Sequence, residues 1–302
     1  MSVYDRRRVN APESHPPIYS TQPKASTSAR RLHSSNHRPD GRQPSQIRPI
    51  FLQTNLIPQS SGSCYIETGN LKIACAVYGP RQVKGRQYAG KAELNVELRF
   101  APFSSKRRRK AGKGTESPIL SSLIHQSLLP SLRLDLLPKA SLDVHLTVLE
   151  CDATEEGCIA AGTIAASTAL ACAGIEMYGL VVGGVAILPR KPSSTQETTV
   201  QSSKADSKES ADLLMDPTLE DSNLPDTKQG TRILLCSMPA LGSTTCLRIT
   251  SGTGGEDVDQ VEKALVVLNA SLNEVHGVVA KAVSADFERR QRAHAGTLVE
   301  AA

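Results

Sequence analysis

The stretch that most constrains the fold runs from Leu142 to Gly174, where a strand pattern passes directly into a helix pattern. Apolar side chains occupy every second position at its start: Leu142, Val144, Leu146 and Val148. This alternation is typical of a strand with one buried face. From Cys158 to Ala173 the chain is rich in alanine, and Gly174 follows where a left-handed helix end is expected. Small side chains let a helix approach its neighbours closely, so we expect this helix to lie in the core.

The turn that joins this strand to this helix is Asp152-Ala153-Thr154-Glu155-Glu156-Gly157. The start of a helix is a natural place to hold a phosphate, because unpaired N–H groups and the helix dipole point there. This turn instead carries three carboxylates and no basic residue. The carboxylates suit the dipole, and Asp152 and Glu155 have the spacing of a capping box. The turn therefore has a structural explanation that requires no chemistry.

Composition indicates that part of the chain does not pack. Only 39% of the 302 residues are hydrophobic and 3% are aromatic, which is low for a fully packed chain of this length. The seven cysteines form no C-x-x-C pair and most fall in apolar segments, which predicts reduced core thiols and neither a metal site nor a disulfide. The first residues are polar and basic, unlike a secretory signal. The longest apolar run, Met177–Leu188, is too short to span a membrane.

Three segments have the composition of chain outside a packed domain. Residues 1–37 predict a flexible basic arm, 190–212 a disordered low-complexity insertion, and 293–302 a C-terminal tail. A single domain over 38–292 remains. Residues 1–49 hold nine Lys/Arg and three Asp/Glu, whereas the whole chain has a net charge of +5. The basic character therefore belongs to the arm and to one later cluster.

The order of the remaining patterns predicts an α+β fold. Four strand patterns precede the first helix, and the last of them, Ala92–Phe100, has one polar face, which indicates an antiparallel or mixed sheet. A helix then begins near Ile119 and is broken by Pro130. After the opening strand and helix, three further strands are expected, at Val181–Leu188, Thr231–Met238 and Thr244–Thr250. An amphipathic terminal helix is marked by Val261, Leu265, Leu268, Leu272, Val275 and Val279.

A basic cluster lies in the loop between Ala92–Phe100 and the first helix. Its members are Arg107, Arg108, Arg109, Lys110 and Lys113, with Lys106 before them. We expect them to contact the RNA backbone, because each Lys or Arg displaces counterions from phosphate. No aromatic residue interleaves the cluster, so base stacking is not predicted. A solvated loop or a nuclear-import patch is an equally good explanation.

Four stretches of this sequence resemble the RNase PH family. The first is RPDGR at 38–42, followed by Ile47-Arg48-Pro49. The second is GSCYIETGN at 62–70 with the VYGPR strand end at 77–81. The third is the Asp152 turn with its alanine-rich helix, and the fourth runs from Met215-Asp216-Pro217-Thr218 to SMPALG at 237–242. The resemblance covers roughly residues 38–290 and is nearest to the ring subunits of the eukaryotic RNA exosome.

The resemblance implies an RNase PH-like fold (also called ribosomal protein S5 domain 2-like), with mixed sheets packed against helices in a unit that closes into six-membered rings. Active members cleave RNA 3′ ends with inorganic phosphate, which a Gly-Gly-Thr-Arg turn holds. The four corresponding residues here are Ala153, Thr154, Glu155 and Glu156. Carboxylates therefore replace the cation that an anion requires, and the resemblance implies a degenerate phosphate site.

The acidic pair that binds a divalent metal in active members is also altered. Asp216 is followed by Pro217, and the next acidic residues are Glu220 and Asp221. We expect Asp216 and Asp221 to be relics of that site, with no metal and no cofactor. His125, His145 and His276 are single, and no other motif predicts a catalytic residue.

The sequence therefore favours a non-catalytic ring subunit of the exosome, in the nucleus, nucleolus and cytoplasm. Expected partners are paralogous RNase PH-like subunits, an S1/KH-type cap protein and RNA in the central channel, with no membrane. Two alternatives stay open. One is an active phosphate-dependent 3′-to-5′ exoribonuclease, and the other is a free-standing RNA-binding adaptor.

Overall fold

The structure of the protein is a computed structural model. The structure describes residues 38, 40–83, 90–105, 108–109, 117–152, 154–189, 213–222, 227, 230–250 and 258–300, with side chains of the last helix up to Arg292. The basic arm at 1–37 and the low-complexity insertion at 190–212 lie outside these residues, as do Lys106, Arg107, Lys110, Lys113 and Ala153.

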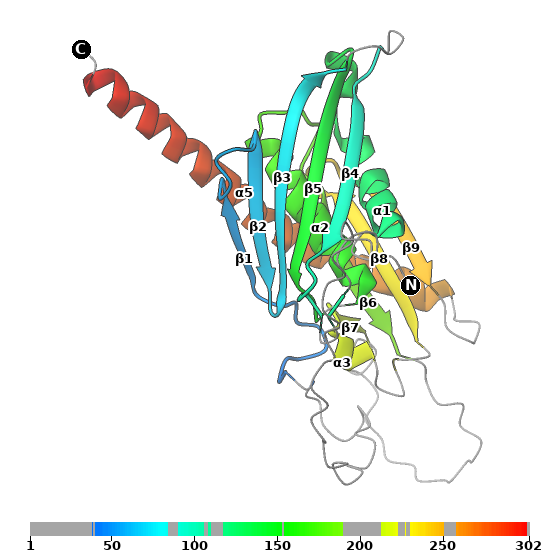
Figure 1. Cartoon of the computed structure of the whole chain (residues 1–302). Coiled ribbons are helices and arrows are strands. Elements are labelled where there is room, and N and C mark those ends of the chain that lie inside the picture. The colour runs from blue at the N-terminus through cyan, green and yellow to red at the C-terminus, as the bar shows by residue number, and fades with distance from the viewer. Residues whose placement is uncertain are drawn as a thin grey trace, which may run out of the picture.

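Two sheets enclose a central helix (Figure 1). The first sheet has the order β1-β2-β3-β5-β4 and is formed by β1 (Ile50–Thr54), β2 (Gly62–Thr68), β3 (Leu71–Gln82), β4 (Glu93–Phe100) and β5 (Ala140–Glu150). All its neighbours are antiparallel except β4 and β5, which run parallel. This mixed sheet confirms the expectation drawn from the polar face of Ala92–Phe100.

The second sheet is antiparallel and has the order β7-β6-β8-β9. Its strands are β6 (Val182–Leu188), β7 (Leu214–Met215), β8 (Thr231–Met238) and β9 (Ser243–Thr250). A short helix, α3 (Leu219–Ser222), follows β7. The strands predicted for this half lie within one residue of the observed bounds.

Helix α2 (Glu155–Cys172) packs against β2 and β3 of the first sheet and β6 of the second. It is buried on nearly all sides, which its alanine-rich sequence permits. At its C-terminal end the approach is closest, because a Cβ at Gly62 would lie 2.4 Å from the Ala169 carbonyl oxygen and 2.5 Å from the Ala173 amide nitrogen. The hydroxyls of this buried helix have hydrogen-bond partners: Thr163 Oγ1 donates to the Ile159 carbonyl and Thr168 Oγ1 to the Ile164 carbonyl, and Ser167 Oγ accepts the Val181 amide, each at 2.8 Å.

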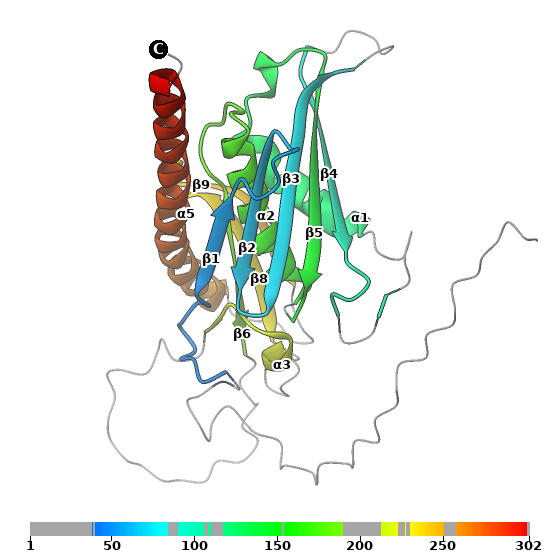
Figure 2. The same cartoon turned by 60° about the vertical axis from the view of Figure 1, so that its left-hand side comes forward.

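Helix α1 (Pro118–Leu128) covers β4 and touches α2 and β9, and it ends, as predicted, just before Pro130. Helix α5 (Val258–Glu300) packs on β6, α2, β1 and β8 through Leu268, Leu272 and Val279. Figure 2 shows α5 running beside β1, and Figure 1 shows its last turns projecting away from the body of the domain. The helix continues to Glu300, so helical backbone extends through residues 293–300 of the range 293–302 that we expected to form a separate tail.

Candidate functional site at the start of helix α2

The candidate site is the turn between β5 and α2. Thr154 is the N-cap residue of α2, and its side-chain oxygen accepts a hydrogen bond from the Gly157 amide at 3.2 Å. The capping box predicted from Asp152 and Glu155 is therefore wrong. The Asp152 backbone oxygen instead accepts the Leu219 amide at 2.8 Å, which turns that residue toward the segment after β7.

The two glutamates of the first helical turn have different surroundings. Glu155 is exposed, whereas Glu156 is buried. Among the described residues, the cation nearest to Glu156 is Arg232 of β8, whose Nη1 lies 3.9 Å from Glu156 Oε2. Within the described residues Glu156 Oε2 has no hydrogen-bond partner. A buried carboxylate therefore lies in the first turn of α2, where the helix dipole would otherwise favour an anion.

Arg48 brings a positive charge to this turn from the segment before β1. Its guanidinium forms two bonds with Asp216, Nη2 to Oδ1 at 2.7 Å and Nε to Oδ2 at 2.7 Å, and the Arg48 amide also donates to Oδ2 at 3.1 Å. Arg48 Nη1 lies 3.4 Å from Asp152 Oδ1. Its donors are thus largely used by two carboxylates, so Arg48 is not positioned as a spare phosphate ligand.

The carboxylates of Asp216 and Asp152 respond differently to the same guanidinium. Burial alone would raise the pKa of Asp216, but hydrogen bonds from Arg48 and its charge outweigh burial and hold that pKa below its usual value. For Asp152 burial dominates and raises the pKa, although Arg48 acts in the opposite direction. Asp216 also adopts a φ of +47°, in the left-handed region, so the pairing fixes an unfavourable backbone conformation.

The N-terminal arginines fasten the same segments together. Arg38 donates to the carbonyls of Pro44 and Met215, and Arg42 donates to the carbonyl of Asp216 at 3.3 Å. Backbone bonds complete the join, including the Met215 amide to the Pro44 carbonyl at 2.8 Å. The RPDGR stretch therefore serves here to anchor the chain that leads into β1.

Asp221, the second predicted relic, has a structural role. It is fully buried; its Oδ2 accepts the Thr218 amide at 3.0 Å, and Thr218 Oγ1 accepts the Asp221 amide at 3.2 Å. This reciprocal pair is a capping box at the start of α3. In the described part of the chain, no three His, Cys, Asp or Glu side chains gather closely enough to hold a metal ion.

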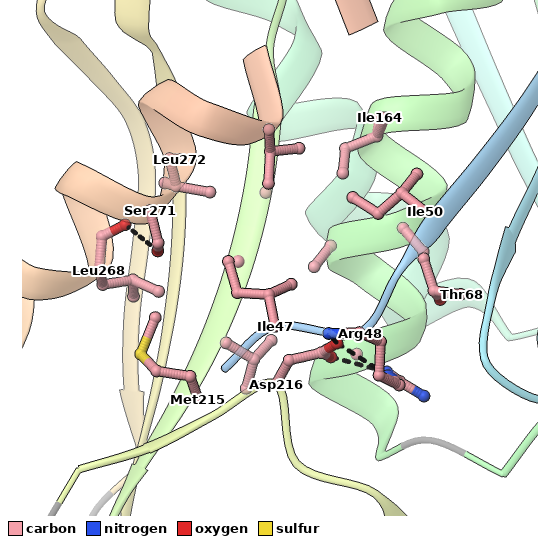
Figure 3. A pocket seen from close by; sticks show the side chains of 17 residues that line it. Ile47, Arg48, Ile50, Thr68, Ile164, Met215, Asp216, Leu268, Ser271 and Leu272 are labelled. Carbon is pink, nitrogen blue, oxygen red and sulfur yellow. Dashed lines mark hydrogen bonds and ion pairs between the residues drawn. The ribbon is translucent and has the colours of Figure 1, made fainter. Parts of the chain in front are cut away.

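A small cavity lies beside the Arg48–Asp216 pair (Figure 3). Its volume is about 40 Å³, and its apolar end is lined by Ile47, Ile164, Met215, Leu268 and Leu272. A space of this size holds about one to three water molecules. It marks the seam between β1, α2, β6 and α5 and is too small for an organic substrate.

Two members of the basic loop fall within the described residues. Arg108 is exposed. Arg109 instead places its guanidinium 3.9 Å from the ring centroid of the buried Phe100, a cation–π contact. The loop therefore approaches the end of β4, and only Arg108 of these two points its charge to solvent.

Sequence reasoning missed Arg48 as the central charge of the site. The signal was present, since Ile47-Arg48-Pro49 belongs to one of the four diagnostic stretches. Nothing in that stretch, however, identifies Asp152 and Asp216 as its partners, because they lie 104 and 168 residues away.

Comparisons with known proteins identify the family to which the chain belongs. A model of the 3′ exoribonuclease family (RNase PH), domain 1, matches residues 46–176. Exosome complex component MTR3 of mouse (Mus musculus) is 33% identical over 270 residues, which cover 83% of this chain and 85% of the mouse protein. MTR3 of Homo sapiens is 32% identical over 267 residues, covering 83% and 84%. The chain belongs to the RNase PH family, which confirms the resemblance found in its motifs.

Other relatives match in part or in fold. Exosome complex component Rrp41 of Pyrococcus horikoshii is 41% identical over 152 residues, which cover 50% of this chain and 60% of the archaeal protein. The crystal structure of rice (Oryza sativa) Rrp46 has a TM-score of 0.61 at 18% identity, covering 82% of this chain and all of that one. This likeness confirms the predicted α+β, RNase PH-like fold. No helix among the described residues is long and apolar enough to cross a membrane.

Proposed function

We propose that this chain is a non-catalytic subunit of the RNA exosome ring. It pairs with paralogous RNase PH-like subunits in a six-membered ring, lines the RNA channel and supports an S1/KH-type cap protein. It acts in the nucleus, nucleolus and cytoplasm, where RNA is processed and degraded from its 3′ end. Two relatives that match most of its length are named exosome complex components.

The observation that carries the non-catalytic assignment is the buried carboxylate of Glu156 at the start of α2. A phosphate bound there would meet like charge. At 4 Å two unit charges repel by about 1 kcal/mol in water and about 4 kcal/mol near a protein surface. Arg48 does not offset this repulsion, because Asp216 and Asp152 already neutralise the charge of its guanidinium.

The acidic residues support the same assignment. Asp216 is held by Arg48 and Asp221 by the capping box of α3. A divalent cation at either carboxylate would have to displace these partners, and breaking a buried pair costs about 3–5 kcal/mol.

Phosphate-dependent release of nucleoside diphosphates from a labelled RNA tests this assignment. We expect none from the full chain at millimolar phosphate. A matched variant with Ala153→Gly, Thr154→Gly, Glu155→Thr and Glu156→Arg restores the expected family turn and should gain phosphate binding in calorimetry, while the native chain shows none. Nucleoside diphosphate release by the native chain would refute the proposal.

RNA contact by the basic loop needs a separate test. Replacing Arg107, Arg108, Arg109 and Lys110 by alanine should weaken RNA binding of the assembled ring. The slope of log K against log salt should fall by about 0.7 for each lost phosphate contact. The variant with Lys263, Lys281, Arg289 and Arg292 replaced by alanine loses the same charge from α5 and serves as the control. An unchanged slope in the loop variant means that the loop does not contact RNA.

A further inference from the structure

Two cysteines flank the β5–α2 turn and touch each other. Cys151 follows the last residue of β5, and Cys158 lies in the first turns of α2. Their Sγ atoms are 3.2 Å apart, close enough for a thiol hydrogen bond. A small movement of each side chain would bring the sulfurs to the bonding distance of about 2.05 Å.

The two thiols differ in access. Cys151 is half-buried, whereas Cys158 is 1% exposed. The hydrogen bond with Cys151, together with burial, raises the pKa of the Cys158 thiol well above its usual value, while the charges of Arg48 and Arg109 act in the opposite direction. An oxidant from solvent therefore meets Cys151 first, and Cys158 waits behind it as a protonated thiol.

We propose that Cys151 and Cys158 form a reversible disulfide when the protein meets a peroxide. The Cys151 sulfur, after losing its proton to solvent, attacks one oxygen of the peroxide. The O–O bond breaks, a Cys151 sulfenic acid forms, and with hydrogen peroxide the second oxygen leaves as water after taking up a proton.

In the second step the Cys158 sulfur attacks the sulfenic sulfur of Cys151. The S–S bond forms, the S–O bond breaks, and the hydroxyl leaves as water with the proton of Cys158. The two sulfurs give up two electrons to one molecule of hydrogen peroxide, and two water molecules result. A dithiol reductant reverses the change by thiol–disulfide exchange.

The bond would close a short loop that contains Asp152, Thr154 and Glu156. Its ends are fixed by β5 on one side and by the core helix on the other. Oxidation would therefore fasten the helix start to the sheet without moving either element far, and the change would be local to the turn.

The chain provides two internal comparisons. Cys64 faces Cys75 across β2 and β3, and Cys236 faces Cys246 across β8 and β9. Cys64, Cys75 and Cys236 are fully buried or nearly so. Among the described cysteines, a sulfur–sulfur contact is formed only by Cys151 and Cys158, so this pair should oxidise first.

The test treats the folded full chain with hydrogen peroxide and maps the product after blocking free thiols. Cleavage after Glu150, Glu155 and Glu176 places Cys151 and Cys158 in different peptides. We expect these peptides to be joined, with fragmentation locating the bond at Cys158 rather than Cys172, and to separate after dithiothreitol. The joined fraction should form at least roughly tenfold faster in the folded chain than in urea, because folding brings the two sulfurs together.

Two variants complete the experiment. Cys158→Ser should leave Cys151 oxidised to sulfenic or sulfinic acid with no link, and Cys151→Ser should leave Cys158 unmodified at the same dose. Circular dichroism verifies that both remain folded, and the mapping of the native chain stands without them. Equal rates in the folded and urea-unfolded chain, or earlier linkage of Cys64–Cys75 or Cys236–Cys246, would overturn the proposal.

Discussion

The Arg48–Asp216 pair and the β5–α2 turn lie side by side, but their buried carboxylates differ in how closely a cation neutralises them. Asp216 receives two guanidinium bonds of 2.7 Å and one amide bond. Glu156, close by on α2, is also buried, yet the nearest cation among the described residues, Arg232, is 3.9 Å away. The first region joins segments distant in sequence and needs its charges matched. The second is held by a cap and by helix burial, so its charges can change without loss of the fold.

Of the changes that test this comparison, replacing Arg48 by methionine should lower the stability of the protein most. The change leaves the Asp216 carboxylate buried without its partner, so we expect a loss of about 3–5 kcal/mol in the free energy of unfolding. Urea unfolding measures it. Arg292→Ala is the control, because Arg292 and Glu288 form an exposed pair at 3.2 Å that contributes less than about 0.5 kcal/mol. A loss below about 1 kcal/mol for Arg48→Met would remove the distinction between the two regions.

Gly62→Ala tests whether the C-terminal end of α2 packs too closely against β2 to accept a larger side chain. The added methyl would overlap the backbone of Ala169 and Ala173, so we expect a loss of about 1–3 kcal/mol or more in thermal or urea unfolding. Gly277→Ala in α5 is matched chemistry in open space, since nothing lies within 4 Å of its Cβ position. It should stabilise the protein by up to about 1 kcal/mol through helix propensity. If both variants changed the free energy of unfolding in the same direction, the packing described for α2 would be contradicted.

Thr154→Ala tests whether Thr154 is the residue that caps the start of α2. Loss of the N-cap oxygen leaves the Gly157 amide without its partner, which should lower the free energy of unfolding by about 1 kcal/mol. Thr154→Ser keeps the oxygen and should recover most of that loss. If Asp152→Ala were the more damaging change in the same assay, Asp152 would be the cap after all.

The smallest expected effect concerns pH. The lowered pKa of Asp216 means that its contribution to stability is complete above the unfolded value of about 3.9 and is lost as pH falls through the folded value. The raised pKa of Asp152 has the opposite sign, because its charged form opposes folding at neutral pH and protonation relieves this as pH falls. Asp152→Asn should therefore raise stability at pH 7 by less than about 0.5 kcal/mol.

Comparing Asp152→Asn with Asp216→Asn between pH 7 and pH 3 checks both signs. Asp216→Asn should be destabilising at pH 7 and should lose less stability than the native chain on acidification. A common direction for the two variants at pH 7 would show that Arg48 does not distinguish its two partners.

Much of this structure could be predicted because its signals are local. Strand alternation at Leu142–Val148 and the alanine run after Cys158 identified β5 and α2 closely. The cap was misplaced by two residues because Asp152 and Thr154 are both good capping residues. What decided between them was the contact of Asp152 with Arg48 and Leu219, which no window of sequence contains.

The functional positions were harder for the same reason. Arg109 was predicted from its charge to contact RNA, and this stays a prediction; the contact of its guanidinium with Phe100, nine residues earlier, was not predicted. Asp216 and Asp221 were singled out through the family resemblance, while their partners Arg48 and Thr218 became visible only in the folded chain. Residue type identified which groups carry charge, whereas tertiary structure decided which of them are buried and what neutralises them.

The pairing of Arg48 with distant partners also affects the order in which the chain can fold during synthesis. It is synthesised 168 residues before Asp216, an interval of roughly 8–34 s at the usual pace of translation. Asp152 follows Arg48 by 104 residues, or roughly 5–21 s. Through that interval the guanidinium must remain in water. The first sheet can therefore pair its strands early, but the join between β1 and β7 closes only after most of the polypeptide has left the ribosome.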